Sequence, residues 1–146
     1  NGGRDWGRSG WEVGSYAEGI QTPSVAEAVR PVVARGMADF VASDQRAADA
    51  VWLEPTPGHT PGHVSVRISS RGEEAIITGD LVHHPIQLAE PQWKMMADSD
   101  PDLATATRIA FVERYGDKPV LIIGTHFGGP TAGHIVRDGD GCRFEA

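Results

Sequence analysis

Hydrophobic and polar residues alternate with a period of two over residues 64–69. Such alternation is typical of a β-strand with one buried face. The polar run 70–73 predicts a tight turn, and the apolar run 74–78 predicts a returning, buried strand. The pattern therefore predicts a β-hairpin over residues 64–78.

Other short apolar stretches predict further strands. Residues 51–53 and 119–123 each have the length and composition of a strand. Near the end of the chain, residues 135–136 and 142–144 flank an Asp-Gly turn, which predicts a final hairpin.

The first predicted helix begins at Ser24, because Glu27 follows three residues later and completes a capping box. Pro31 removes a backbone donor and predicts a kink or a restart of the helix. We expect the helix to continue over residues 34–40 and the polar stretch 43–50 to be a connection. The apolar stripe expected to pack comprises Val25, Ala28, Val29, Val32 and Val33.

The second predicted helix is capped by Asp100, with Pro101 in its first turn and Gly116 as its stop. Residues 81–99, which precede it, have little periodicity and are expected to form a long loop. The residues expected to pack this helix are Leu103, Thr107, Ile109, Ala110 and Phe111.

The order of these elements predicts an α/β layer: a mixed, mostly antiparallel sheet with helices on one face. Residues 1–23 are rich in glycine and show no period, so two hypotheses stand for them. They form either a disordered lead-in or a flap whose aromatic side chains cover a pocket. We therefore divide the chain into residues 1–23 and a domain of residues 24–146.

The composition limits the classes of partner that the chain can bind. The 146 residues suffice for one modest domain, and a net charge of −7 argues against nucleic acid or an anionic membrane as partner. No apolar run approaches the length of a membrane span. The single cysteine, Cys142, cannot form an internal disulfide and is expected to be a packing residue. Nothing in the sequence marks the compartment, and a cytoplasmic location is the default expectation.

Three segments carry residues suited to metal chemistry. Residues 56–63 read TPGHTPGH, Asp80 follows the apolar run 75–78, and His126 follows the apolar stretch 119–123 and a glycine. Imidazole and carboxylate groups at the ends of separate strands are the ligand types of a zinc site.

The words TPGHTPGH, ITGD and GTHF, in this order, resemble those of the metallo-β-lactamase-fold hydrolases, such as lactonases and glyoxalase II. The resemblance runs from about residue 51 to residue 144. It implies a four-layer αββα sandwich and a zinc site in which His63 binds the first ion, His126 binds the second, and Asp80 bridges both. Asp80 is then the expected catalytic residue.

The family's main ligand motif, HxHxDH, has no counterpart, because none of the six histidines precedes His59. We therefore expect the chain to be the carboxyl-terminal αβ half of such a sandwich. Zinc binding by an isolated monomer is expected to be weak or absent. The second face of the sheet should be apolar and uncovered, and either a homodimer or a missing amino-terminal half would cover it.

Four more residues are candidates for the surroundings of the metal. We interpret His59 as a residue that shapes the loop or orients a ligand through hydrogen bonds. His83 and His84 either line the substrate pocket or only pack against the site. Trp93 resembles an apolar pocket wall, although in half a domain it could equally lie in an interface.

The resemblance implies a zinc-dependent hydrolase, whole or truncated, in which metal-bound hydroxide attacks an ester, lactone or similar carbonyl of a small molecule. The missing motif keeps two alternatives open. One is a non-catalytic module for assembly or binding, and the other is a half that works only with a separate amino-terminal chain.

Overall fold

The computed structural model of the protein describes residues 25–146. The predicted lead-in or flap of residues 1–23 and the predicted cap at Ser24 lie outside them. Contacts divide the chain into two compact units, with the boundary between Phe40 and Val41.

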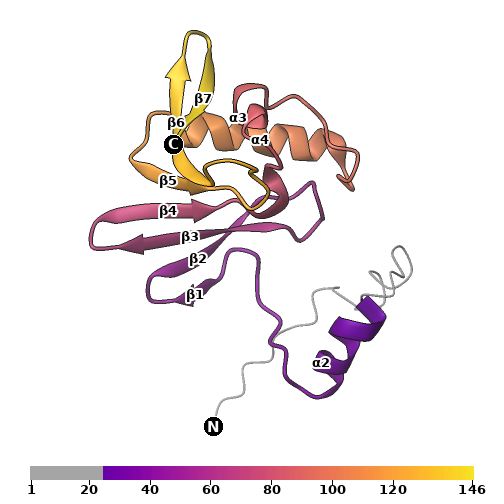
Figure 1. Cartoon of the computed structure of the whole chain (residues 1–146). Helices are drawn as coiled ribbons and strands as arrows, with labels where there is room; N and C mark the ends of the chain where they lie inside the picture. The colour runs from indigo at the N-terminus through magenta and orange to yellow at the C-terminus, as the bar shows by residue number, and fades with distance from the viewer. Residues whose placement is uncertain (1–24) are drawn as a thin grey trace. The chain divides into compact units, whose positions relative to one another are not determined.

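The described part of the first unit is one short helical segment. A π-helical turn, η1 (Val25–Val29), leads into α2 (Arg30–Ala34), and Pro31 lies in the first turn of α2 (Figure 1). The restart predicted at Pro31 is confirmed, since a missing N–H costs least at a helix start. The continuation predicted over residues 34–40 is wrong: Arg35 ends the helix, and Gly36 follows with a positive φ of 65°.

The second unit is built on one seven-stranded sheet in the order β1-β2-β3-β4-β5-β6-β7 (Figure 1). All neighbours are antiparallel except β4 and β5, which are parallel. The short strand β1 lies within residues 43–50, where only a connection was predicted. The strands are β1 (Arg46–Ala48), β2 (Val51–Pro55), β3 (Val64–Ser70), β4 (Glu73–Ile77), β5 (Val120–Ile123), β6 (Ala132–Asp138) and β7 (Gly141–Glu145).

Both predicted hairpins are confirmed. Arg71 and Gly72 join β3 to β4 with φ values of 55° and 84°. Two successive positive φ values define the turn whose twist matches that of the flanking strands. The second hairpin pairs β6 with β7 around Gly139, which also has a positive φ.

Three helical segments follow β4: the 3₁₀ turn η2 (Gly79–Leu81), α3 (Ile86–Ala89) and α4 (Pro101–Tyr115). The predicted start of α4 is confirmed, because the Asp100 carboxylate accepts a hydrogen bond from the Leu103 amide at 3.0 Å. Gly116 is its carboxyl-terminal cap, as predicted.

The predicted packing face of α4 is wrong in part. Leu103 and Ile109 are 41% and 37% exposed. The helix buries residues spaced by three or four, the repeat of one helical face, rather than its most apolar residues. These buried residues are Ala104, Arg108, Phe111, Val112 and Tyr115.

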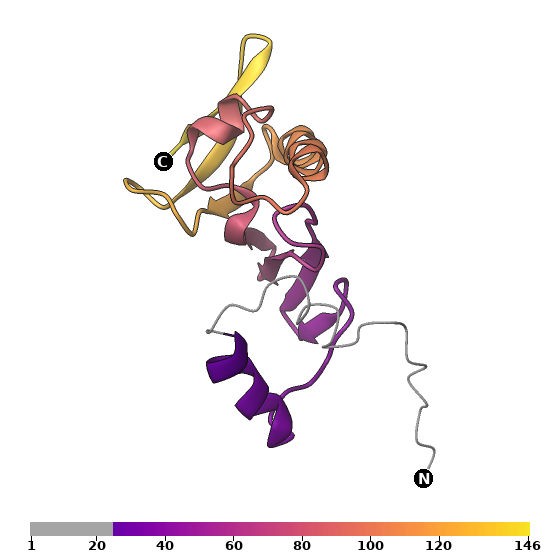
Figure 2. The same ribbon diagram turned by 90° about the vertical axis from the view of Figure 1, so that its right-hand side faces the viewer.

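The core lies on one face of the sheet. Ile76 and Ile122 pair in register, are fully buried, and pack with residues of α3 and α4. Figure 2 shows α4, seen end-on, beside the sheet. The strand residues on either side of Ile76 and Ile122 point to the other face of the sheet and are only half-buried. No helix of residues 41–146 packs a core against that face. The predicted apolar face is thus confirmed, and within residues 41–146 no helix covers it. It comprises Val51, Leu53, Val66, Ile68, Ala75, Ile77, Leu121 and Ile123.

Among the described residues, no helix combines the length and the hydrophobicity needed to cross a membrane.

Candidate metal centre

Asp80 lies at the centre of a group of imidazoles. It follows β4 within η2, and its side chain is 40% exposed. Its Oδ1 lies 2.7 Å from His126 Nε2, and its Oδ2 lies 3.4 Å from His59 Nε2. The carboxylate therefore contacts imidazoles from two loops that are far apart in the sequence.

Parallel pairing brings Asp80 and His126 together. Because β4 and β5 are parallel and Ile77 pairs with Ile123, the two strands end at the same edge of the sheet. A hydrogen bond of 3.0 Å from the Thr78 amide to the Ile123 carbonyl continues the pairing past the last strand residues. The loops that leave this edge carry Asp80 and His126.

The loop of His126 is anchored by Phe127. The Phe127 ring is 6% exposed and packs against Phe144, with ring centroids 5.1 Å apart. A Cβ on Gly124 would lie 2.4 Å from the same ring, so only glycine allows the ring this close to the backbone. The exposed His126 thus directly precedes a well-packed residue, which fixes its place in the loop.

His83 joins this pair from the segment after η2. Asp80, His83 and His126 each offer one ligand atom, and the three atoms lie within 4.8 Å of one another. The His83 ring stacks on that of His126, with centroids 4.8 Å apart and planes at 16°. Its Nδ1 is buried and has no hydrogen-bond partner among the described residues.

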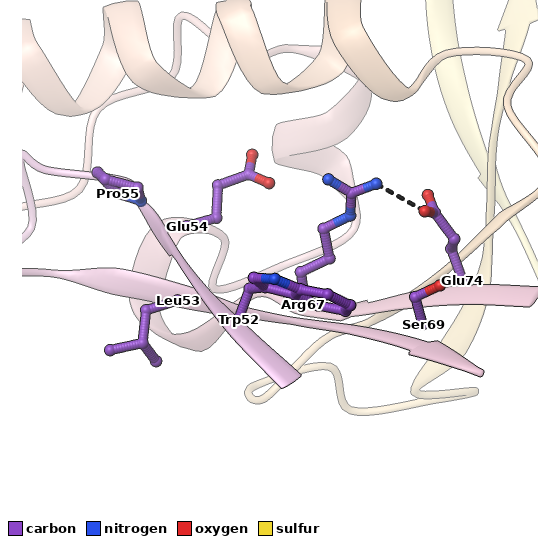
Figure 3. Close-up of a pocket in the computed structure, with 7 residues that line it drawn as sticks. All are labelled: Trp52, Leu53, Glu54, Pro55, Arg67, Ser69 and Glu74. Atoms are coloured by element: carbon purple, nitrogen blue, oxygen red, sulfur yellow. Dashed lines mark hydrogen bonds and ion pairs between the residues drawn. The ribbon is translucent and has the colours of Figure 1, made fainter. Parts of the chain in front are cut away.

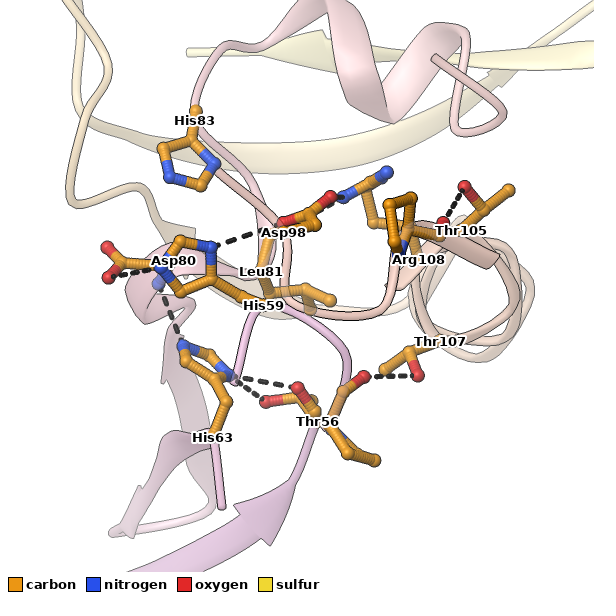
Figure 4. A network of polar contacts seen from close by, with 12 residues as sticks. Thr56, His59, His63, Asp80, Leu81, His83, Asp98, Thr105, Thr107 and Arg108 are labelled. Atoms are coloured by element: carbon orange, nitrogen blue, oxygen red, sulfur yellow. Dashed lines mark hydrogen bonds and ion pairs between the residues drawn. The ribbon is translucent and has the colours of Figure 1, made fainter. Parts of the chain in front are cut away.

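His63 lies next to Asp80 but outside this cluster (Figure 4). Its Nδ1 lies 3.0 Å from the Thr56 carbonyl oxygen, which can only accept, so Nδ1 carries the proton. Its Nε2 accepts a hydrogen bond of 2.9 Å from the Asp80 amide. Both nitrogens of His63 are engaged, and its role as a metal ligand stays a prediction that requires Nε2 to release this amide.

Gly79 makes the contact between Asp80 and His63 possible. It has a positive φ of 56°, and a Cβ at this position would lie 2.8 Å from His63 Nε2. The glycine of the ITGD word therefore lets the main chain turn tightly over the imidazole.

His59 is held by a buried ion pair. Its Nδ1 lies 3.2 Å from Asp98 Oδ1, and Asp98 in turn lies 3.6 Å from the Arg108 guanidinium (Figure 4). The side chains of Asp98 and Arg108 are 0% and 1% exposed. This arrangement fixes the His59 ring so that Nε2 faces Asp80.

Arg108 also holds the loop of residues 81–99. Its guanidinium donates hydrogen bonds to the carbonyls of Leu81, Pro91 and Trp93. Sequence reasoning missed Asp98 and Arg108. The available signal was an arginine, Arg108, spaced along α4 with residues that pack. No sequence pattern relates Arg108 to Asp98.

The structure brings neither His84 nor Trp93 to Asp80. His84 is exposed, and its Nδ1 accepts a hydrogen bond from the Ile86 amide in a local turn. The Trp93 side chain is 55% exposed. Their predicted place in a substrate pocket stays a prediction.

The charges of the centre reinforce one another. Burial acts to raise the pKa of Asp80, but the hydrogen bond from His126 and the nearby imidazoles outweigh it, and the pKa lies below its usual value. Burial lowers the pKa of His63 and that of His83. Lowered pKa values favour the ionised carboxylate and the neutral imidazole, which are the forms that bind a metal ion.

The donor set fits one zinc ion. Two imidazoles and a carboxylate match the ligands of three-residue zinc sites, and the unpaired Nδ1 shows that His83 has a nitrogen to give. A second ion fits less well, because both nitrogens of His63 are already engaged.

A separate pocket of about 510 Å³ lies along β2, β3 and β4 (Figure 3). Its charged side chains already have partners: Arg67 donates a hydrogen bond of 2.6 Å to Glu74, and Glu54 accepts hydrogen bonds from Arg114 and Tyr115 of α4. It offers no group of the metal centre. Its lining residues are Trp52, Leu53, Glu54, Pro55, Arg67, Ser69 and Glu74.

Residues 44–126 match the model of a family described as the metallo-beta-lactamase superfamily. No curated protein sequence matches the chain.

Several solved structures are similar to the chain. AidC, a dizinc quorum-quenching lactonase in complex with a product, is 27% identical, with a TM-score of 0.68 over 76% of this chain and 38% of AidC. AbOPH, a hydrolase, is 26% identical, with a TM-score of 0.75 over 84% of this chain and 42% of AbOPH. A B. thuringiensis AiiA variant with N-decanoyl-L-homoserine bound at the active site is 26% identical, with a TM-score of 0.51 over 62% of this chain and 36% of AiiA. The chain thus spans less than half the length of each.

Proposed function

The chain belongs to the metallo-beta-lactamase superfamily, and from this premise we propose that it is a metal-dependent hydrolase of esters or lactones. The observation that carries the proposal is the position of Asp80. Its carboxylate contacts His126 at 2.7 Å and His59 at 3.4 Å, at the sheet edge where β4 and β5 end together. A carboxylate so placed among imidazoles suits a metal site rather than a structural ion pair.

Asp80 and His126 are the proposed zinc ligands, and His63 joins them where its Nε2 releases the amide of Asp80. Zinc, when bound, polarises a carbonyl oxygen and lowers the pKa of water. His59 Nε2 faces the carboxylate of Asp80, and the buried Asp98 holds the opposite ring nitrogen. We assign His59 the task of keeping Asp80 oriented and of accepting or returning a proton at Nε2.

The proposed substrate is a small ester or lactone, and an N-acyl homoserine lactone is the first to test. Two structures similar to this chain hold N-acyl homoserines. On the loop of residues 81–99, Trp93 and Met96 are exposed apolar side chains, which supports a role as the wall for an acyl chain. His83 and His84 are the proposed polar residues of this pocket.

A specific observation also favours a role in assembly. The face of the sheet opposite α4 is apolar over β2, β3, β4 and β5, and no helix of residues 41–146 packs on it. A continuous apolar surface without a covering helix suits a contact with another protein surface. We propose that a second copy of the chain, or a separate amino-terminal half, covers this face.

Substitution of Asp80 tests the proposed hydrolase. With zinc present, Asp80→Asn should reduce hydrolysis of an aryl ester and of an acyl homoserine lactone by about 100-fold or more, because the amide cannot replace an anionic ligand. His134→Gln is the matched control, since His134 is exposed on β6 and alternates with the buried Ile135. Equal rates for Asp80→Asn and the unchanged chain would rule out the proposed site.

A further inference from the structure

The segment after η2 places a third donor beside Asp80 and His126. His83 follows Asp80 by three residues, and its backbone amide donates a hydrogen bond of 2.8 Å to Gln87 Oε1. This bond fixes the main chain at His83 against the start of α3. The ring then stacks on His126. The position of the imidazole is thus set by the fold.

His83 carries a nitrogen without a partner. Its Nδ1 is buried, and no group of residues 25–146 forms a hydrogen bond with it. A buried polar atom left unpaired is unfavourable, so this atom calls for a partner beyond the described residues. A metal ion binds a neutral imidazole through one nitrogen. Bound at Nδ1 of His83, it would be the missing partner of this atom; bound at Nε2, it would hold the ring in place.

His63 and His59 are less suited to a first ion. His63 donates from Nδ1 to Thr56 and accepts at Nε2 from the Asp80 amide. His59 Nδ1 faces the buried Asp98. The ligand atoms of Asp80, His83 and His126, by contrast, already lie within 4.8 Å of one another.

We propose that Asp80, His83 and His126 form a site for a single zinc ion that this chain completes by itself, with His83 as its third ligand. Two imidazoles and one carboxylate are a sufficient protein donor set for zinc. Arg108 holds Asp98, and Asp98 holds His59, whose Nε2 lies 3.4 Å from Asp80 Oδ2. This chain of contacts orients the carboxylate of the site. The inference concerns binding and does not depend on the proposed hydrolysis.

Zinc titration calorimetry on the metal-free chain and three variants tests the inference. His83→Phe keeps a ring over His126 but removes both nitrogens, and His83→Cys restores a zinc ligand. His63→Gln removes the alternative ligand. We expect one zinc per chain, a loss of affinity of about 10-fold or more in His83→Phe, recovery in His83→Cys, and no comparable loss in His63→Gln.

A zinc-induced rise in the thermal unfolding temperature provides a second readout for each variant and shows that each is folded. The inference is overturned if the unchanged chain binds no zinc, or if His63→Gln loses affinity while His83→Phe does not. Hydrolysis that needs Asp80 but tolerates His83→Phe without loss of zinc would refute this inference and leave the proposed function standing.

Discussion

At the scale of single residues, Tyr115 shows how one buried polar contact shifts a proton equilibrium. Its hydroxyl donates a hydrogen bond of 2.7 Å to Glu54. Burial, this bond and the charge of Glu54 raise the pKa of Tyr115 from 10.0 to about 12. Because the neutral phenol is favoured in the folded state, its contribution to stability is complete below pH 10.0 and is lost as the pH rises through about 12.

Replacing Glu54 tests this coupling. In Glu54→Gln the acceptor remains but the charge is gone, so we expect the pKa of Tyr115 to fall toward its ordinary value. The ultraviolet absorbance of tyrosinate, followed against pH, measures the change. Tyr115→Phe identifies the transition by removing it. An unchanged titration in Glu54→Gln would show that burial alone sets the pKa.

Gly58 is the residue at which the loop of residues 56–63 contacts α4. Its φ is 132°, and a Cβ there would lie 2.3 Å from the backbone of Ala104. We expect Gly58→Ala to destabilise the fold by about 2 kcal/mol or more, measured by urea unfolding. The matched control is Gly72→Ala, which also has a positive φ but meets nothing within 4 Å, and which should cost about 1 kcal/mol. Equal costs would mean that the contact with α4 is unimportant.

At the scale of elements, the first turn of α4 is bonded to the loop of residues 56–63. The Asp100 carboxylate caps the helix, and the Asp100 amide donates a hydrogen bond of 2.9 Å to the Gly58 carbonyl. Asp100→Ala should lower the free energy of unfolding by about 1 kcal/mol, because the Leu103 amide loses its acceptor. Asp100→Ser keeps an acceptor and should recover most of that loss. Chemical denaturation of the two variants decides whether the cap acts as described.

Elements were predictable where a local rule decides them. The alternation in β3, the two-residue turn at Arg71 and Gly72, and the cap at Asp100 each depend on residues close in the sequence. The packing face of α4 was not predictable from hydrophobicity, because tertiary contacts select it. The loop of residues 81–99 holds Arg108 in the interior, while Leu103 stays exposed. Tertiary contact overrides local preference in such cases.

The sequence predicts some contacts of the candidate site, and others follow only from the fold. The proximity of Asp80 and His126 could be expected, because each follows an apolar strand and a glycine. The contact of His59 with Asp98 joins residues 39 positions apart through the fold of a loop, and no periodicity predicts it. The free nitrogen of His83 likewise emerges only when every neighbouring donor and acceptor has been placed.

At the scale of the whole molecule, Ile76 and Ile77 separate folding from assembly. Ile76 is fully buried under the helices, whereas Ile77 lies half-buried on the opposite, apolar face of the sheet. Ile76→Thr should cost about 2 kcal/mol or more of stability. Ile77→Thr should cost less in the monomer and should weaken association, measured by sedimentation over a range of concentrations. A chain that stays monomeric at all concentrations would contradict the proposed second copy, and the separate amino-terminal half would remain as the partner to test.

The most direct test of the central claim is the dependence of lactone ring opening on bound zinc. The metal-free chain, titrated with zinc, should open an N-acyl homoserine lactone at a rate that rises with zinc occupancy and falls to background when a chelator is added. Ring opening that ignores both zinc and chelator would contradict a metal-dependent hydrolase. Stoichiometric zinc without any ring opening or ester hydrolysis would do so as well, and would favour the role in assembly.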